Sequence, residues 1–172
     1  MAFTYSKLAE STVGAGGTSA ITFNNIPQNY TDLVVKISGR STNTSTARGI
    51  FIAFNSSTSG YNDRFLRGSG SAAISATDNG GGSKIYLGEA PASDATTSTF
   101  SNIEVYIPNY SGSTNKSVSV DSVQEHNATE AYATLVAGLL SNPTAINSLS
   151  LTTSLNFAQH STATLYGIRI EL

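Results

Sequence analysis

The sequence predicts an all-β protein, an antiparallel β-sandwich of jelly-roll type with about nine or ten strands. Three observations predict it. Apolar residues recur at every second position in many short segments, which is the period of a strand with one buried face. Clusters of Gly, Pro, Asn and Asp, typical of turns, separate these segments. Short strands at this spacing, without an intervening helical pattern, indicate a sandwich or a barrel.

The clearest strands are five segments in which apolar and polar residues alternate: 33–37, 50–54, 103–107, 118–120 and 164–170. In the first of them Leu33, Val35 and Ile37 share one face. Weaker candidates lie at 3–8, 19–25, 62–68, 84–88 and 147–153. The segment 128–140 is ambiguous because its alanines and leucines also suit a helix. Thr134 and Gly138 disfavour a helix there, and we interpret the segment as a buried strand.

Two stretches have the composition of long loops. Ser41 to Ala47 consists almost wholly of Ser, Thr and Asn, and Gly68 to Ser83 is dominated by Gly, Ser, Ala and Asp. Neither stretch contains enough apolar surface to offset the entropy lost on ordering it, so we expect both to be exposed. Such loops are either simple connections or contact surfaces.

The composition restricts the classes of function. The chain has 172 residues, which fits a single domain, residues 1–172, with a core of its own. Only 12% of the residues are charged, none is cysteine and two are histidine. Disulfides and thiolate metal sites are thereby excluded, and few groups are left for acid, base or metal chemistry. We therefore expect no enzyme, no cofactor and no metal.

Nucleic acid and membranes are not expected as partners. The formal net charge is −2, so the basic surface of a phosphate-backbone binder is missing. No apolar run approaches the ~20 residues that cross a bilayer. The first seven residues lack the basic and apolar regions of a signal peptide, so we expect synthesis in the cytoplasm.

The densest group of ionisable residues is Asp121, Glu125, His126 and Glu130. If 117–125 is one strand, Asp121 and Glu125 lie on one face about 13 Å apart. This is longer than the ~5–9.5 Å between the two carboxyl groups of glycosidases. We interpret the group as a solvated strand end that leads into a loop.

Aromatic side chains beside turns are candidate contacts, since exposed tyrosines stack on sugar rings. Tyr30, Tyr61 and Tyr110 are the candidates for contacts at surface loops. The alternative is that such tyrosines hydrogen-bond to loop backbone groups, which is the commoner role of a corner tyrosine. We favour this structural role.

The first ten residues carry three candidate assembly contacts, Phe3, Tyr5 and Leu8. A terminal segment of this kind adds a strand to the open edge of a neighbour, or pairs within its own sheet as an edge strand. We slightly favour the edge strand.

Three segments carry a resemblance to a known group of proteins. They are Ile21–Val35, Tyr106–Ser117 and the closing Ala163–Ile168. Over nearly its whole length the chain resembles small virion structural proteins from tailed phages of aquatic bacteria. The resemblance implies a non-enzymatic β-sandwich. It also implies a place on the capsid as a decoration or cement protein, or on the tail as a fibre or adaptor part.

We expect a capsid decoration protein that binds the outer capsid surface and stabilises the shell. Its partners would be the major capsid protein and itself, as a homotrimer on local three-fold axes. The protein would be made in the host cytoplasm and end on the capsid exterior of the virion. The alternative is a tail-fibre or tail-adaptor module that recognises a host-surface glycan with the two long loops and exposed tyrosines.

Overall fold

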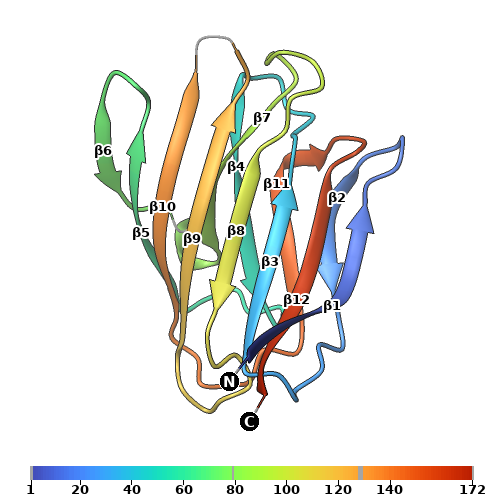
Figure 1. Cartoon of the computed structure of the whole chain (residues 1–172). Helices are drawn as coiled ribbons and strands as arrows, with labels where there is room; N and C mark the ends of the chain where they lie inside the picture. Colours follow the sequence, from blue (N-terminus) through green and yellow to red (C-terminus); the bar gives the residue numbers. More distant parts are fainter. Residues whose placement is uncertain (1, 79, 128–129, 172) are drawn as a thin grey trace.

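The computed structural model describes residues 2–78, 80–127 and 130–171, and the side chains of all of these except the first two and the last two. Two antiparallel sheets pack face to face (Figure 1). The larger sheet has eight strands, in the spatial order β1 (Ala2–Thr12), β12 (Thr162–Glu171), β3 (Asp32–Ser38), β8 (Asn102–Ile107), β9 (Lys116–Glu125), β10 (Ala131–Leu140), β5 (Tyr61–Gly68) and β6 (Ala73–Ala76). The smaller sheet has four, in the order β2 (Thr18–Phe23), β11 (Leu149–Phe157), β4 (Ala47–Phe54) and β7 (Ile85–Pro91).

Eight of these strands have the connectivity of a jelly roll. One jelly-roll sheet is β1-β12-β3-β8 and the other is β2-β11-β4-β7. Among these eight strands, the chain changes sheet at every step except from β4 to β7. This is the arrangement of two four-stranded sheets that defines the fold. The predicted antiparallel, jelly-roll-like sandwich is therefore confirmed, with twelve strands in place of about nine or ten.

The four remaining strands widen the larger sheet on one side. They form two hairpins, β5–β6 and β9–β10, which are inserted after β4 and after β8 and which pair with each other through β5 and β10. We call these four strands the extension. Figure 1 shows it on the left, where it reaches past β7, the edge strand of the smaller sheet.

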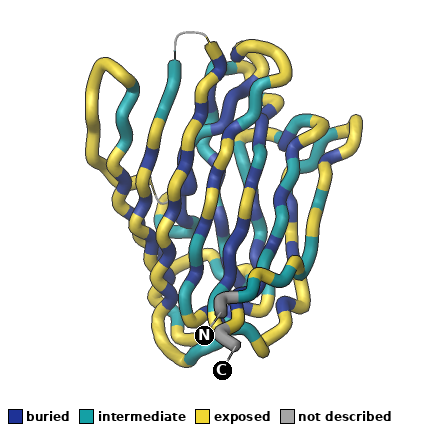
Figure 2. The backbone as a smooth tube through the Cα atoms, viewed as in Figure 1, coloured by how far each residue is buried: buried dark blue, intermediate teal, exposed yellow. Residues whose placement is uncertain are grey.

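The core lies between the two sheets and consists of the inward side chains of the strands. Figure 2 shows buried and exposed residues alternating along many of the strands. On β4 these are Ile50, Ile52 and Phe54, all fully buried. β7 packs closely against the extension because the residue of β10 that faces it, Gly138, has no side chain. A Cβ atom at Gly138 would lie 2.7 Å from Cγ2 of Ile85.

Three sequence predictions need correction. The stretch 68–83, predicted as a loop, contains β6 and a 3-10 turn, η1 (Gly80–Gly82), although residues 70–78 are exposed as expected. The stretch 41–47 is exposed only in part, because Ser41 and Ala47 are buried. The ambiguous segment does form a strand, β10, but only one of its faces is buried. No helix in the described ranges has the length and apolar character needed to cross a membrane.

Candidate functional site: an apolar face and a polar cleft

The outer surface of the extension is apolar and open to solvent. We call this surface the apolar face, and it consists of outward side chains on β5, β9 and β10: Leu66, Val123, Ala133, Leu135, Ala137 and Leu139. Leu135 is 57% exposed and Leu66 is 54% exposed. Four of the seven large apolar side chains that the described residues expose lie here. Apolar clusters of this kind mark interaction sites in soluble proteins.

β10 explains why the face is apolar. Its inward residues, such as Val136 and Leu140, pack in the core, while the outward residues alternate between alanine and leucine. A strand that is apolar on both faces is typical of a sheet covered on both sides. In this chain only the inner side is covered. The pairing register places Leu135 directly between Leu66 of β5 and Asp121 of β9.

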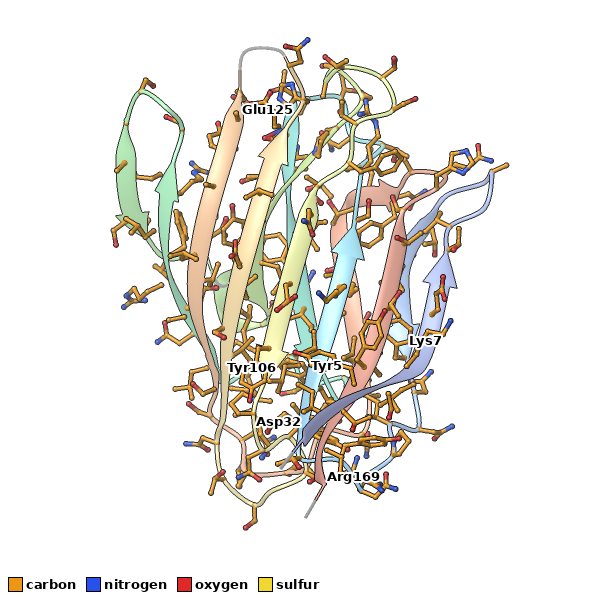
Figure 3. All side chains as sticks on the ribbon, in the orientation of Figure 1. Tyr5, Lys7, Asp32, Tyr106, Glu125 and Arg169 are labelled. Atoms are coloured by element: carbon orange, nitrogen blue, oxygen red, sulfur yellow. The ribbon has the colours of Figure 1, made fainter. Side chains whose placement is uncertain are left out.

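The outer surface of the larger sheet becomes polar and aromatic beyond the extension, over β8, β3, β12 and β1 (Figure 3). Tyr106 on β8 donates a hydrogen bond to Asp32 on β3, with 2.7 Å between Oη and Oδ2. This hydrogen bond to a carboxylate raises the pKa of Tyr106 to about 12. The ring of Tyr5 lies edge-on to that of Tyr166, with 6.2 Å between the ring centroids. The polar and aromatic side chains at this end are therefore paired with one another within the chain.

The three candidate assembly residues of the N-terminal segment have different environments. β1 pairs with β12 along its length and so is an edge strand of its own sheet, the alternative that we favoured. Tyr5 is 54% exposed and available for contact, whereas Leu8 packs against the core of its own chain. The side chain of Phe3 lies outside the described part. Leu8 is only partly exposed and packs on its own core, so its role as an assembly contact stays a prediction.

The three candidate surface tyrosines are largely structural. Tyr61 and Tyr110 are buried, which contradicts their prediction as surface contacts and agrees with the structural role that we favour for them. The hydroxyl of Tyr61 contacts the backbone of Phe54, accepting from its amide at 2.7 Å, and that of Tyr110 donates to the carbonyl of Pro27. Tyr30 is half-buried, with its ring 5.1 Å from the guanidinium carbon of Arg169.

A second feature is a polar cleft of about 420 Å³ between the extension and the edge of the smaller sheet. The two predicted long loops meet there, since Ser45 from one and Asp78 from the other line it. Two of its lining residues, Arg67 of β5 and Glu89 of β7, form an ion pair, with 3.2 Å between Nη1 and Oε1. The guanidinium of Arg67 also lies over the ring of Tyr132, 4.4 Å from its centroid.

Two carboxylates of the cleft, Glu89 and Glu130, accept hydrogen bonds from neighbouring side chains. Glu89 also accepts a hydrogen bond from the hydroxyl of Tyr86 at 3.1 Å, and Glu130 accepts one from Thr46 Oγ1 at 2.5 Å. Burial raises the pKa of Glu89, and burial together with the charge of Asp63 raises that of Asp78. The cleft therefore offers aromatic surface and hydrogen-bonding oxygens.

The four ionisable residues that lie near one another in sequence at the end of β9 point in different directions in the structure. Asp121 and Glu125 point outward from β9 into solvent, on one face as predicted, whereas His126 points inward and is buried. Glu130 turns toward the polar cleft instead. Sequence reasoning missed the apolar face and Arg67, Glu89 and Tyr132, since these three come from separate strands.

The comparisons add no functional information. No protein-family model matches this chain. No similarity to a curated protein was found either. Among the described residues, no group of three or more His, Asp or Glu side chains is placed to hold a metal ion.

Proposed function

We propose that this chain is a non-enzymatic structural protein of a phage particle, most simply a decoration protein that binds the outside of the capsid and stabilises the shell. The observation that carries the proposal is the apolar face, where Leu135 and Leu66 are more than half exposed in a folded chain. Such a surface suits close packing against other protein.

Three further points support this class of function. The sequence segments 21–35, 106–117 and 163–168 carry the resemblance from which we expect a virion structural protein. The jelly roll is a common fold of viral capsid proteins, although a fold alone does not assign a function. In the polar cleft Glu89 and Glu130 accept hydrogen bonds from Tyr86 and Thr46, and Glu89 also pairs with Arg67, so these carboxylates serve contacts within the chain.

The proposed partners are the major capsid protein and further copies of this chain, without nucleic acid or membrane. Shell symmetry alone favours a homotrimer on the capsid exterior. The apolar face, which covers one side of the extension only, limits the ways in which copies can meet.

The copy number of this chain per purified phage particle tests the proposal. Quantitative mass spectrometry would measure it relative to the major capsid protein. Hundreds of copies in a fixed ratio to the shell protein support the decoration role. A few to a few dozen copies assign the chain to the tail, and the absence of the chain from the particle refutes the virion role.

The second candidate function is recognition of a host-surface glycan at the tail, and the polar cleft favours it. Both long loops reach the cleft, and Tyr132 supplies an aromatic ring there. Jelly rolls also occur as lectin domains. Sugar recognition combines aromatic contact with directed hydrogen bonds, which the hydroxyl and carboxylate oxygens of the cleft provide.

A glycan array separates this candidate from the first. A glycan that binds the wild type should lose binding on Tyr132→Ala and keep it on Tyr30→Ala, the matched control outside the cleft. If no glycan of a broad array binds the wild type, or if both variants lose binding equally, the cleft is not a glycan site.

A further inference from the structure

We infer that the apolar face is the contact between two copies of this chain, which meet face to face about a two-fold axis parallel to β10. The inference rests on the proposed function, since both use the apolar face, and it identifies a second copy of this chain as the partner of that face. It does not depend on where in a phage particle the protein is placed. A patch that contacts its own copy closes at two subunits, so this contact gives a dimer in place of the trimer that shell symmetry alone favours.

The shape of the face suits such a contact. Alanine and leucine alternate along β10, so that Leu135 and Leu139 project while Ala133 and Ala137 leave space beside them. Shallow depressions of about 430 and 340 Å³ flank Ala137 on its two sides. About a two-fold axis parallel to β10, each outward residue of this strand faces the same residue of the second copy, so Leu135 and Leu139 meet their own counterparts at the ~10 Å spacing of packed sheets.

Charge selects the direction of the axis. The strands beside β10 carry opposite charges on the outer side, Arg64 on β5 and Asp121 with Glu125 on β9. A two-fold axis parallel to β10 places β5 of one copy over β9 of the other. An axis across the strands would place β5 over β5 and bring like charges together.

The pairing register specifies which charges meet. Arg64 and Ser119 both pair with Ala137, and Asp121 pairs with Leu135, one step along the same face. In the proposed dimer Arg64 therefore lies within reach of Asp121 of the second copy. Within the described part of a single chain, Arg64 and Asp121 take part in no ion pair. Arg64 instead donates to Asn62 of its own strand, at 3.0 Å.

The size of the face sets the expected affinity. Three strands of about eight residues give a footprint of roughly 14 by 27 Å. A standard interface buries about 800 Å² on each partner, roughly twice the area of this footprint. We therefore expect a dimer that dissociates on dilution through the micromolar range.

Sedimentation equilibrium of the purified chain over the micromolar range tests the inference. We expect a monomer–dimer equilibrium, and Leu135→Asp should raise its dissociation constant by about tenfold or more. Leu155→Asp is the matched control, since Leu155 is 64% exposed but lies on β11 of the other sheet. Leu135→Thr, which retains a strand-forming residue, should weaken the dimer in the same direction.

Exchange of the two charges tests the geometry. Arg64→Glu and Asp121→Arg should each weaken the dimer, and the double variant should restore it. Circular dichroism and thermal unfolding will show that each variant remains folded. A chain that stays monomeric, a trimer, or a dimer unaffected by Leu135→Asp would overturn the inference. A double variant that fails to recover would overturn the two-fold arrangement. Because no phage component is present, these outcomes are independent of the copy number.

Discussion

Asp63 on β5 accepts a hydrogen bond from the backbone amide of Tyr86 on β7, with 3.0 Å between Oδ2 and N. Its other oxygen accepts from Thr77 Oγ1 at 3.1 Å and from the amide of Asp78 at 2.8 Å. The side chain is 2% exposed. This one carboxylate therefore joins the extension to the edge strand of the smaller sheet and satisfies an edge amide that would otherwise be buried without a partner.

We expect Asp63→Asn to lower the free energy of unfolding by about 2–3 kcal/mol. The amide side chain has one acceptor oxygen in place of two, so at least one of the three donors around Asp63 is left unpaired. Urea denaturation measures the change. The matched control is Asp94→Asn at an exposed position, which should change stability by less than about 0.5 kcal/mol. Equal stability of the two variants would mean that the link between the sheets adds no stability.

Glu89 predicts a dependence of stability on pH. Burial raises the pKa of its carboxyl group above the ordinary value of 4.5, although the hydroxyl of Tyr86 and the charge of Arg67 oppose the rise. The folded chain then binds more protons than the unfolded chain at pH values between the two pKa values. The contribution of Glu89 to the free energy of unfolding must therefore fall as the pH rises from about 4.5 through the raised pKa.

Urea midpoints over a pH series will measure this contribution as the difference between the wild type and Glu89→Gln. The variant lacks the titrating group, so the wild type should lose stability relative to it as the pH rises. A relative gain over the same pH range would mean that the ion pair with Arg67 outweighs burial and lowers the pKa of Glu89.

Alternation predicted most strands correctly because most of them have one buried and one exposed face. Lys116 to Glu125, for example, is buried at every second residue without exception. β6 escaped prediction because all four of its residues are exposed, so its sequence carries no burial pattern. It is a strand because its backbone pairs with β5.

The functional surfaces were harder to predict, for two different reasons. The apolar pattern of β10 predicted a strand buried on both faces, but the chain covers only one of them. Sequence periodicity does not show that the other face is left open. Arg67, Glu89 and Tyr132 meet only through the register of β5 with β10 and the packing of β7 on both, which no single strand reveals.

Removal of the buried hydroxyl group of Thr134 should stabilise the protein. Three buried side chains, Gln124, His126 and Thr134, have polar atoms without a hydrogen-bond partner in the described part of the chain. A buried hydroxyl without a partner costs about 1–3 kcal/mol. We expect Thr134→Val, which replaces the hydroxyl by a methyl group, to raise the free energy of unfolding by about 1 kcal/mol.

Thr134→Ser is the matched control for this substitution. It keeps the hydroxyl and removes the methyl group, so it should lower stability instead. Both variants can be compared with the wild type by urea denaturation. If Thr134→Val is the less stable of the two, the hydroxyl has a partner, such as a buried water molecule.

Leu155 predicts a second gain of stability, from backbone conformation. It lies where the pairing of β11 with β2 changes register, between Thr152 and Phe157, and has a φ of 59°. A left-handed conformation costs a residue with a β-carbon about 1–2 kcal/mol, and asparagine tolerates it best after glycine. At 64% exposure the leucine side chain gains little from packing. We therefore expect Leu155→Asn to raise the free energy of unfolding by about 0.5–1 kcal/mol.

For a chain of this length, a gain of that size raises the melting temperature by roughly 1–4 °C, which calorimetry resolves. Leu155→Val should lower the melting temperature, because a β-branched side chain is the least compatible with a positive φ. An unchanged or lower melting temperature for Leu155→Asn would mean that the leucine makes a contact more favourable than the strain of its backbone. Since the dimer inferred here uses the other sheet, both variants should associate as the wild type does.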